Sequence, residues 1–211
     1  MYTNKRILHD SITEISLSPQ QLNEARTLAE SSGYPGLIIP NVLLQAKDAK
    51  NQNGRTYPGG ILEREVQKYI ENFVNNQRSF GELDHPESAS VRLKEASHRI
   101  PKMWWNGPEL RGDIQIIDTP NGKICEAILR AGGRLGISSR SLGSTKKIRN
   151  ESTQDEVEEV QNDLEIVCWD CVSNPSVLNA DFMIREGLEA NTMVLNKYKR
   201  INYLIDRILH I

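Results

Sequence analysis

The chain has 211 residues, of which 38% are hydrophobic, and its formal net charge is −2. This length suits one domain with a substantial core, and the charge argues against a nucleic-acid-binding surface covering the molecule. No run of about 18 apolar residues occurs, and no apolar segment follows the basic start, so we expect neither a transmembrane helix nor a signal peptide.

The first third of the chain combines helix and strand patterns. The segment Ser18-Pro19-Gln20-Gln21 is typical of a capped helix start and predicts a helix that reaches about residue 32. Residues 36–47 predict a strand, and their internal proline indicates an edge or a bulge. After a polar turn region at 51–60, apolar residues at helical spacing predict a helix over about 60–76.

The middle of the chain predicts a hairpin between two short helices. The first short helix is expected at 89–97. Residues 100–105 and 109–118 then read as strands joined by an Asn-Gly turn. A second short helix is expected at 123–130, where two nearby glycines end it.

The last third begins with strands and ends with an amphipathic segment. Strands are predicted at 134–148 and 164–172, separated by an acidic stretch at 150–162 that reads as a solvated loop. Residues 191–210 predict a basic helix with an apolar stripe. That helix would suit docking on the core, contact with a scaffold or another copy, or removal as a propeptide.

Two short blocks carry residues suited to acyl transfer. The sequence Gly-Glu-Leu-Asp-His-Pro occupies 81–86, and Gly-Ile-Ser-Ser-Arg-Ser occupies 136–141. Histidine can take and return a proton near neutral pH, whereas serine is a poor nucleophile until a base removes its proton. A histidine and a serine on separate, rigidly turned segments are the minimum for such chemistry.

Five blocks in order resemble the prohead core proteases of T4-like tailed bacteriophages. They are the two blocks above, Asn-Gly-Arg-Thr-Tyr-Pro at 53–58, Met-Trp-Trp at 103–105 and Pro-Ser at 175–176. The resemblance covers roughly residues 36–178. It implies a fold related to the herpesvirus assemblins, which are serine proteases with a β-barrel core. We therefore expect a mixed α/β fold with a mainly antiparallel, barrel-like β core flanked by helices.

The resemblance also implies a function and a domain organisation. It implies a serine endopeptidase that cuts scaffold and capsid proteins, and itself, after glutamate in Leu/Ile-x-Glu contexts. Such an enzyme would work as a homo-oligomer inside the assembling prohead in the host cytoplasm, with neither nucleic acid nor membrane as a partner. The protease domain is expected at 36–178, after an N-terminal extension with a helix at 1–35 and before a helical tail at 179–211. The alternative is a non-catalytic capsid assembly scaffold protein with the same fold.

The resemblance assigns the two central roles within the blocks. His85 is the expected general base, and His98 is an alternative second imidazole of the assemblin type. Ser138 is the expected nucleophile, since strand alternation would turn it away from the core-facing Ile137. Ser139, on the opposite face, is the first alternative to Ser138. Ser141, expected on the face of Ser138, is the second.

A third group should orient the imidazole. Asp170 is the main candidate, because an acid inside an otherwise apolar strand needs a partner. Asp84, Glu82 and His98 are the alternatives. The remaining histidines, at positions 9 and 210, lie in terminal segments and are expected to have no role.

Acyl transfer also needs groups that stabilise the oxyanion of its intermediate. Backbone amides near Ser138 or at 132–133, helped by Arg134 or Arg140, would stabilise an oxyanion.

No histidine or acidic grouping has convincing metal-ligand spacing, so neither a metal nor a cofactor is expected. The Cys-x-x-Cys at 168–171 lies in a strand-like run, which directs its thiols to opposite faces. All three cysteines are therefore expected to be reduced.

Overall fold

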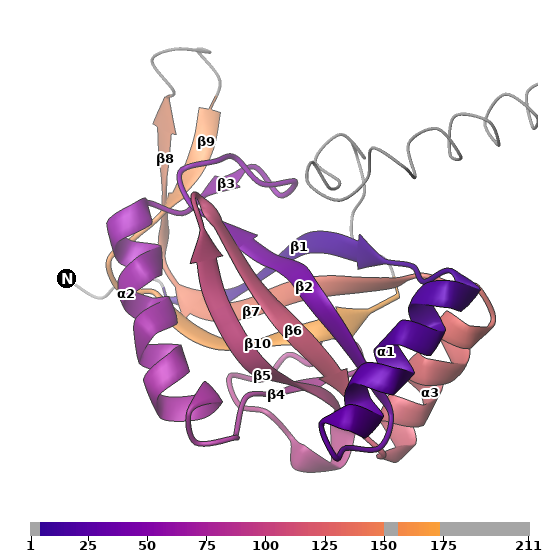
Figure 1. Ribbon diagram of the computed structural model, residues 1–211. Helices are drawn as coiled ribbons and strands as arrows, with labels where there is room; N and C mark the ends of the chain where they lie inside the picture. The colour runs from indigo at the N-terminus through magenta and orange to yellow at the C-terminus, as the bar shows by residue number, and fades with distance from the viewer. Residues whose placement is uncertain (1–4, 150–155, 174–211) are drawn as a thin grey trace, which may run out of the picture. The chain divides into compact units, whose positions relative to one another are not determined.

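The computed structural model describes residues 5–149 and 156–173 (Figure 1). The expected mixed α/β architecture with a mainly antiparallel β core is confirmed. The helical elements are α1 (Pro19–Ser31), α2 (Gly59–Tyr69), a π-helical turn (Ile70–Val74), a 3-10 turn (Leu93–Glu95) and α3 (Pro120–Arg130). The strands are β1 (Arg6–Ile15), β2 (Leu37–Ala46), β3 (Arg55–Thr56), β4 (Phe80–Glu82), β5 (Ala96–Asn106), β6 (Glu109–Ile116), β7 (Leu135–Gly143), β8 (Thr145–Arg149), β9 (Glu156–Val160) and β10 (Glu165–Val172).

Two antiparallel sheets form the barrel-like core. One has the strand order β1-β7-β10, and the other has the order β2-β6-β5-β4. β1 contacts β2 along one side, and on the other a parallel bridge joins Leu83, just after β4, to Cys171 in β10. The two sheets therefore enclose a shared interior, while β3, β9 and β8 form a separate small sheet beside it (Figure 1).

The interior is apolar and is closed by helices at its ends. Trp169 on β10 is among the largest buried side chains. Its indole nitrogen donates to the carbonyl oxygen of Leu44 at 2.6 Å, and its ring meets that of Tyr69 edge-on at 5.2 Å. α1 and α3 contact each other at one end of the barrel, and α2 lies at the other end (Figure 1). The indole bond thus ties the two sheets together across the core.

Several predicted elements are confirmed. α1 carries the expected capping box between Ser18 and Gln21. β2, β10 and the β5–β6 hairpin lie where their apolar patterns placed them. α3 begins three residues earlier than expected, because Thr119 accepts a hydrogen bond from the Gly122 amide and caps the helix there.

Other expectations about elements are wrong. β1, β3 and β4 were not predicted. The helix expected at 89–97 is only a 3-10 turn, after which β5 begins at Ala96. The strand expected at 134–148 is two strands, β7 and β8, and part of the expected acidic loop is β9. Acidic residues of β9 pair with lysines of β8, namely Glu159 with Lys146 and Glu158 with Lys147, so their charges are matched across the ladder.

The predicted domain boundaries remain predictions. The tail helix expected at 191–210 lies outside the described residues. β1, inside the expected N-terminal extension, pairs along most of β7 from Arg6 to Ile15. The first strand of the chain is therefore part of the sheet that holds the serine block.

His98 is a buried group that fastens one sheet to the other. From β5 it reaches the carbonyl oxygen of Trp169 on β10, with its Nε2 at 3.0 Å, while its Nδ1 lies 2.9 Å from the Ser97 hydroxyl. Burial lowers the pKa of His98 from 6.5 to about 4, against smaller opposing effects of Asp170 and of the bond to Trp169. The folded protein therefore holds this imidazole neutral, with both nitrogens bonded.

The neutral state of His98 predicts a loss of stability in acid. A histidine whose pKa is about 4 in the fold and 6.5 in the unfolded chain takes up a proton on unfolding when the pH lies between these two values. Stability is therefore lost as the pH falls from about 6.5 to about 4. The shift corresponds to about 3 kcal/mol over that window. Urea unfolding at several pH values measures this loss. In His98→Gln, which keeps a donor but cannot titrate, the slope over that window should be smaller, and an unchanged slope would contradict the assignment.

Candidate active site

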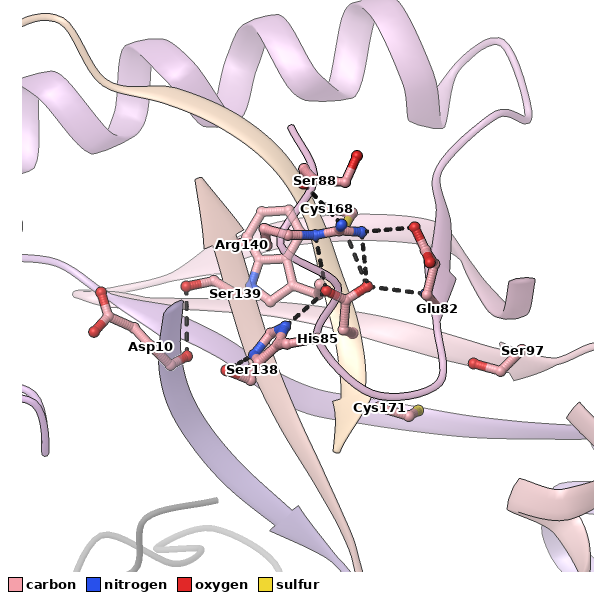
Figure 2. A network of polar contacts seen from close by, with 12 residues as sticks. Asp10, Glu82, His85, Ser88, Ser97, Ser138, Ser139, Arg140, Cys168 and Cys171 are labelled. Carbon is pink, nitrogen blue, oxygen red and sulfur yellow. Dashed lines mark hydrogen bonds and ion pairs between the residues drawn. The ribbon is translucent and has the colours of Figure 1, made fainter. Parts of the chain in front are cut away.

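The structure brings His85, Ser138 and Asp170 into one hydrogen-bonded chain (Figure 2). The His85 Nε2 atom lies 2.6 Å from the Ser138 hydroxyl, and its Nδ1 atom lies 2.8 Å from Oδ2 of Asp170. Ser138 on β7 and Asp170 on β10 are directly paired in the ladder, so their side chains project from the same face of the sheet. With the proton on Nδ1, His85 donates to the carboxylate and accepts from the serine.

The segment that carries His85 is locked against β10 by its backbone. The Asp84 amide donates to the carbonyl oxygen of Cys171 at 2.7 Å, and Asp84 itself adopts a left-handed conformation with φ of 64°. Gly81 lies where β4 passes close to β10. A Cβ atom at Gly81 would lie 2.0 Å from the Trp169 carbonyl oxygen, so glycine permits the close approach of β4 to β10.

Asp170 is fully buried and is held as a carboxylate. Burial alone would raise its pKa. The hydrogen bond from His85, the Arg140 guanidinium, the Glu82 amide and the Cys168 thiol together outweigh burial and lower it. The Arg140 Nε atom lies 3.0 Å from Oδ2 of Asp170, the oxygen that also accepts the hydrogen bond from the imidazole. The carboxylate can therefore stabilise a protonated imidazole without becoming protonated itself.

Arg140 joins two buried carboxylates rather than facing the serine hydroxyl. Its Nη2 atom lies 3.0 Å from Oε1 of Glu82, and its Nη1 donates to the carbonyl oxygen of Ser88 at 2.9 Å (Figure 2). Glu82 in turn accepts the backbone amide of Arg92 at 2.8 Å. The arginine and the glutamate thus hold both ends of the loop that contains His85.

Three of the groups expected to stabilise an oxyanion are engaged elsewhere, namely Arg140, Arg134 and the amides at 132–133. The guanidinium of Arg140 contacts Glu82, Asp170, the Cys168 sulfur and the Ser88 carbonyl group. Arg134 is exposed and pairs with Glu14. The amides of Gly132 and Gly133 bond to carbonyl groups at the end of α3. The glycines at 132–133 precede β7, so they lie beyond the end of the strand that holds Ser138 near its middle.

The alternative serines lie on the other face of β7. The Ser139 hydroxyl accepts from Gln45 at 3.4 Å and lies 3.5 Å from the carbonyl oxygen of Asp10 (Figure 2). Ser141 was expected on the face of Ser138, and this was wrong. The two serines are three positions apart, an odd number, so strand alternation places Ser141 on the face of Ser139, beside Tyr57.

The alternative orienting groups are also placed away from His85. Glu82 is bonded to the two arginines described above, and Asp84 is exposed. His98 is bonded to Ser97 and to the Trp169 carbonyl group on the far side of β10. Of the groups considered from the sequence, Asp170 is the one that contacts the imidazole.

β1 contributes to the site, which was not predicted from the sequence. His9, expected to have no role, stacks on His85 with ring centroids 4.1 Å apart and planes 2° from parallel. The adjacent Asp10 is fully buried and bonded to Arg55, Asn53 and Tyr57 of the block at 53–58. The clue in the sequence was a run rich in β-branched residues over 7–15, which would have indicated a strand.

The three cysteines form no disulfide within the part of the chain that the structure describes. Cys125, Cys168 and Cys171 are buried free thiols, and the last two contact different partners, the Asp170 carboxylate and His98. Within residues 5–149 and 156–173, no group of three or more histidine, cysteine or acidic side chains could hold a metal ion. The same residues include no helix long and apolar enough to cross a membrane.

Comparisons with known proteins agree on one family. A family model described as prohead core protein serine protease matches residues 11–192. The prohead core protein protease of Enterobacteria phage T4 is 41% identical, over 58% of this chain and 69% of that protein. The solved structure of the bacteriophage T4 capsid assembly protease matches with a TM-score of 0.64 and 28% identity, and covers 82% of this chain and 99% of that one.

The buried arginine predicts a large stability effect. Arg140→Met would leave Glu82 and Asp170 without their shared cation, and loss of one partner from a buried pair costs about 3–5 kcal/mol. The matched control is Arg134→Met, which removes an exposed pair worth at most about 1 kcal/mol. Chemical denaturation measures both variants. Equal free energies of unfolding in the two would contradict the role given to Arg140.

The orienting carboxylate predicts an effect on serine reactivity. In Asp170→Asn, the imidazole loses the acceptor that fixes its tautomer, so labelling of Ser138 by a serine-directed phosphonate should slow by about 10³- to 10⁴-fold. The exposed Asp84→Asn is the control and should react like the wild type. Labelling followed by mass spectrometry gives both rates. Similar rates in Asp170→Asn and the wild type would assign the role elsewhere.

Proposed function

This chain belongs to the prohead core protein serine protease family, and we propose that it is a serine endopeptidase of phage capsid maturation. The observation that carries the proposal is the hydrogen-bonded chain from Ser138 through His85 to Asp170. A nucleophile, a base and an orienting carboxylate at these distances are the parts that acyl transfer needs.

In the proposed reaction, the Ser138 oxygen attacks a peptide carbonyl carbon while its proton passes to Nε2 of His85. The carbon–nitrogen bond then breaks as the imidazolium returns that proton to the leaving amine, and an acyl-enzyme remains. A water molecule then gives a proton to His85 and attacks the ester carbon. The carbon–oxygen bond to Ser138 breaks as the imidazolium returns that proton to the serine oxygen, which releases the acid and restores both residues. Throughout, Asp170 stays ionised and stabilises the imidazolium.

The proposed substrates follow from the relatives and from the motif resemblance. One relative is called a prohead core protein protease and another a capsid assembly protease, and these names support scaffold and capsid proteins as substrates. We expect cleavage after glutamate in Leu/Ile-x-Glu contexts, inside the prohead in the host cytoplasm. We expect it to act there as a homo-oligomer and to need no cofactor. We expect it to bind neither nucleic acid nor a membrane.

Self-cleavage would be governed by local unfolding. Several matches to Leu/Ile-x-Glu lie in folded elements: Glu14 in β1, Glu24 and Glu30 in α1, and Glu95 in a 3-10 turn. A protease cuts only a segment that can leave its element, so these sites should be spared at first. The match at 184–186 lies outside the described residues, and we expect the early cut there.

A second candidate function is a non-catalytic scaffold protein of the same fold. The observation that favours it is the complete burial of Ser138, whose residue surface is 0% exposed. Under the protease proposal, a peptide reaches Ser138 only after a local opening, as in other enzymes whose sites are covered between turnovers. Under the scaffold alternative, the hydroxyl would never react.

Removal of the Ser138 hydroxyl separates the two functions. Ser138→Ala leaves Nε2 of the partly buried His85 without its partner, which costs at most about 1–3 kcal/mol, so the variant should still fold. It should fail to cut a peptide containing Leu-x-Glu and should accumulate at full length. Ser139→Ala, on the opposite face of β7, is the matched control and should retain much of the activity. Peptide cleavage and intact mass measure the outcome.

Two other results would contradict either the choice of nucleophile or the protease function. Cleavage by Ser138→Ala together with none by Ser139→Ala would move the nucleophile by one residue. A wild-type protein that cuts neither the peptide nor itself, and that no serine-directed phosphonate labels, would favour the scaffold function.

A further inference from the structure

The imidazole of His85 has a neighbour on its flat face that the proposed mechanism does not use. His9 on β1 lies parallel to it, with 4.1 Å between ring centroids and 2° between planes. In the β1–β7 ladder, His9 is paired with Arg140, so strand alternation puts its side chain on the face of the sheet that carries Ser138. The stacking partner of His85 therefore comes from the strand that flanks the serine strand.

His9 is held firmly in this position from the other side of its strand. Its carbonyl oxygen accepts hydrogen bonds from Asn53 at 2.7 Å and from Arg55 at 3.0 Å. The next residue, Asp10, binds the same two side chains at 2.7 and 2.6 Å and also the Tyr57 hydroxyl. The block at 53–58 thus clamps β1 at the two residues where it passes the site.

The two hydrogen bonds of His85 do not define its orientation completely. They act at its two nitrogens and in the plane of the ring, so they fix a line through the imidazole and leave rotation about that line free. A flat contact on the ring face removes this remaining freedom. It also blocks the space into which the imidazole would swing if either bond broke.

We propose that His9 is a positioning residue for His85: it holds the imidazole plane in which Nε2 meets Ser138 and Nδ1 meets Asp170. The inference rests on the proposed function, because positioning matters only if His85 transfers a proton. It also gives the block at 53–58 a role, through its bonds to the backbone of His9 and to Asp10.

The charge of His9 suits this role. Burial, and then the nearby His85, lower its pKa, and Arg140 acts in the same direction, whereas Asp170 and Asp10 oppose them. Its Nε2 atom is buried and has no hydrogen-bond partner among the described residues. A neutral ring can stack on His85 in both protonation states, whereas a cationic one would repel the imidazolium that forms during catalysis.

The test compares His9→Ala with His9→Phe in the full chain. Alanine removes the flat face, so kcat for a Leu-x-Glu peptide should fall by about 10- to 100-fold with KM little changed. The rate of phosphonate labelling of Ser138 should fall in parallel. Phenylalanine restores a flat ring without a titrating nitrogen and should recover most of both losses. Ile7→Ala, which truncates a partly buried residue on the same strand and face, is the control and should leave both rates near the wild type.

The outcomes distinguish this inference from the proposed function. Wild-type labelling and cleavage that survive unchanged in His9→Ala, with the fold intact by thermal unfolding, would overturn the positioning role and leave the protease proposal standing. Equal losses in His9→Ala and Ile7→Ala would also overturn it, since they would indicate damage to β1 in general. An unreactive wild-type protein would overturn both proposals.

Discussion

The architecture around the site depends on one buried cation, the guanidinium of Arg140. It lies between the carboxylates of Glu82 on β4 and Asp170 on β10, and all three side chains are fully buried. Charges in such a place are tolerated only when paired, so the strands that carry them must come together in one register. The same pairing keeps Asp170 ionised. A further hydrogen bond from Arg140 to the Ser88 carbonyl oxygen attaches the loop after β4 to the sheet. One arginine therefore links the stability of the fold to the state of the site.

The site lies along the seam where the two sheets approach each other. Ser138 and Asp170 come from one sheet, and His85 follows directly on β4, the edge strand of the other. The seam is closed by backbone contacts, namely the bridge from Leu83 to Cys171 and the bond from Asp84 to the same residue. These contacts fix the loop that carries His85 to β10, so the distances between the three side chains depend on the packing of the two sheets.

The sequence predicted the parts of the site that follow from local rules. Alternation along β7 separated Ser138 from Ser139 correctly, and an acid within an apolar strand marked Asp170 as a residue that needed a partner. Local rules did not predict β1 and β9. Their charged and polar side chains suggest exposure to water, but in the fold they contact charged partners on other strands. Such compensation comes from strands far away in the chain. The stacking of His9 on His85 and the pairing of Arg140 with two carboxylates both depend on the register between distant strands. Composition and local spacing do not encode that register.

The burial of the cysteines has a practical consequence. All three thiols of the chain are buried, and the pKa values of Cys168 and Cys171 on β10 are raised well above the usual value. A thiolate is the reactive form of cysteine, so these two thiols are inert while β10 stays packed in the sheet. The rate at which an alkylating reagent modifies Cys168 and Cys171 would therefore report the local opening of β10 without any added label.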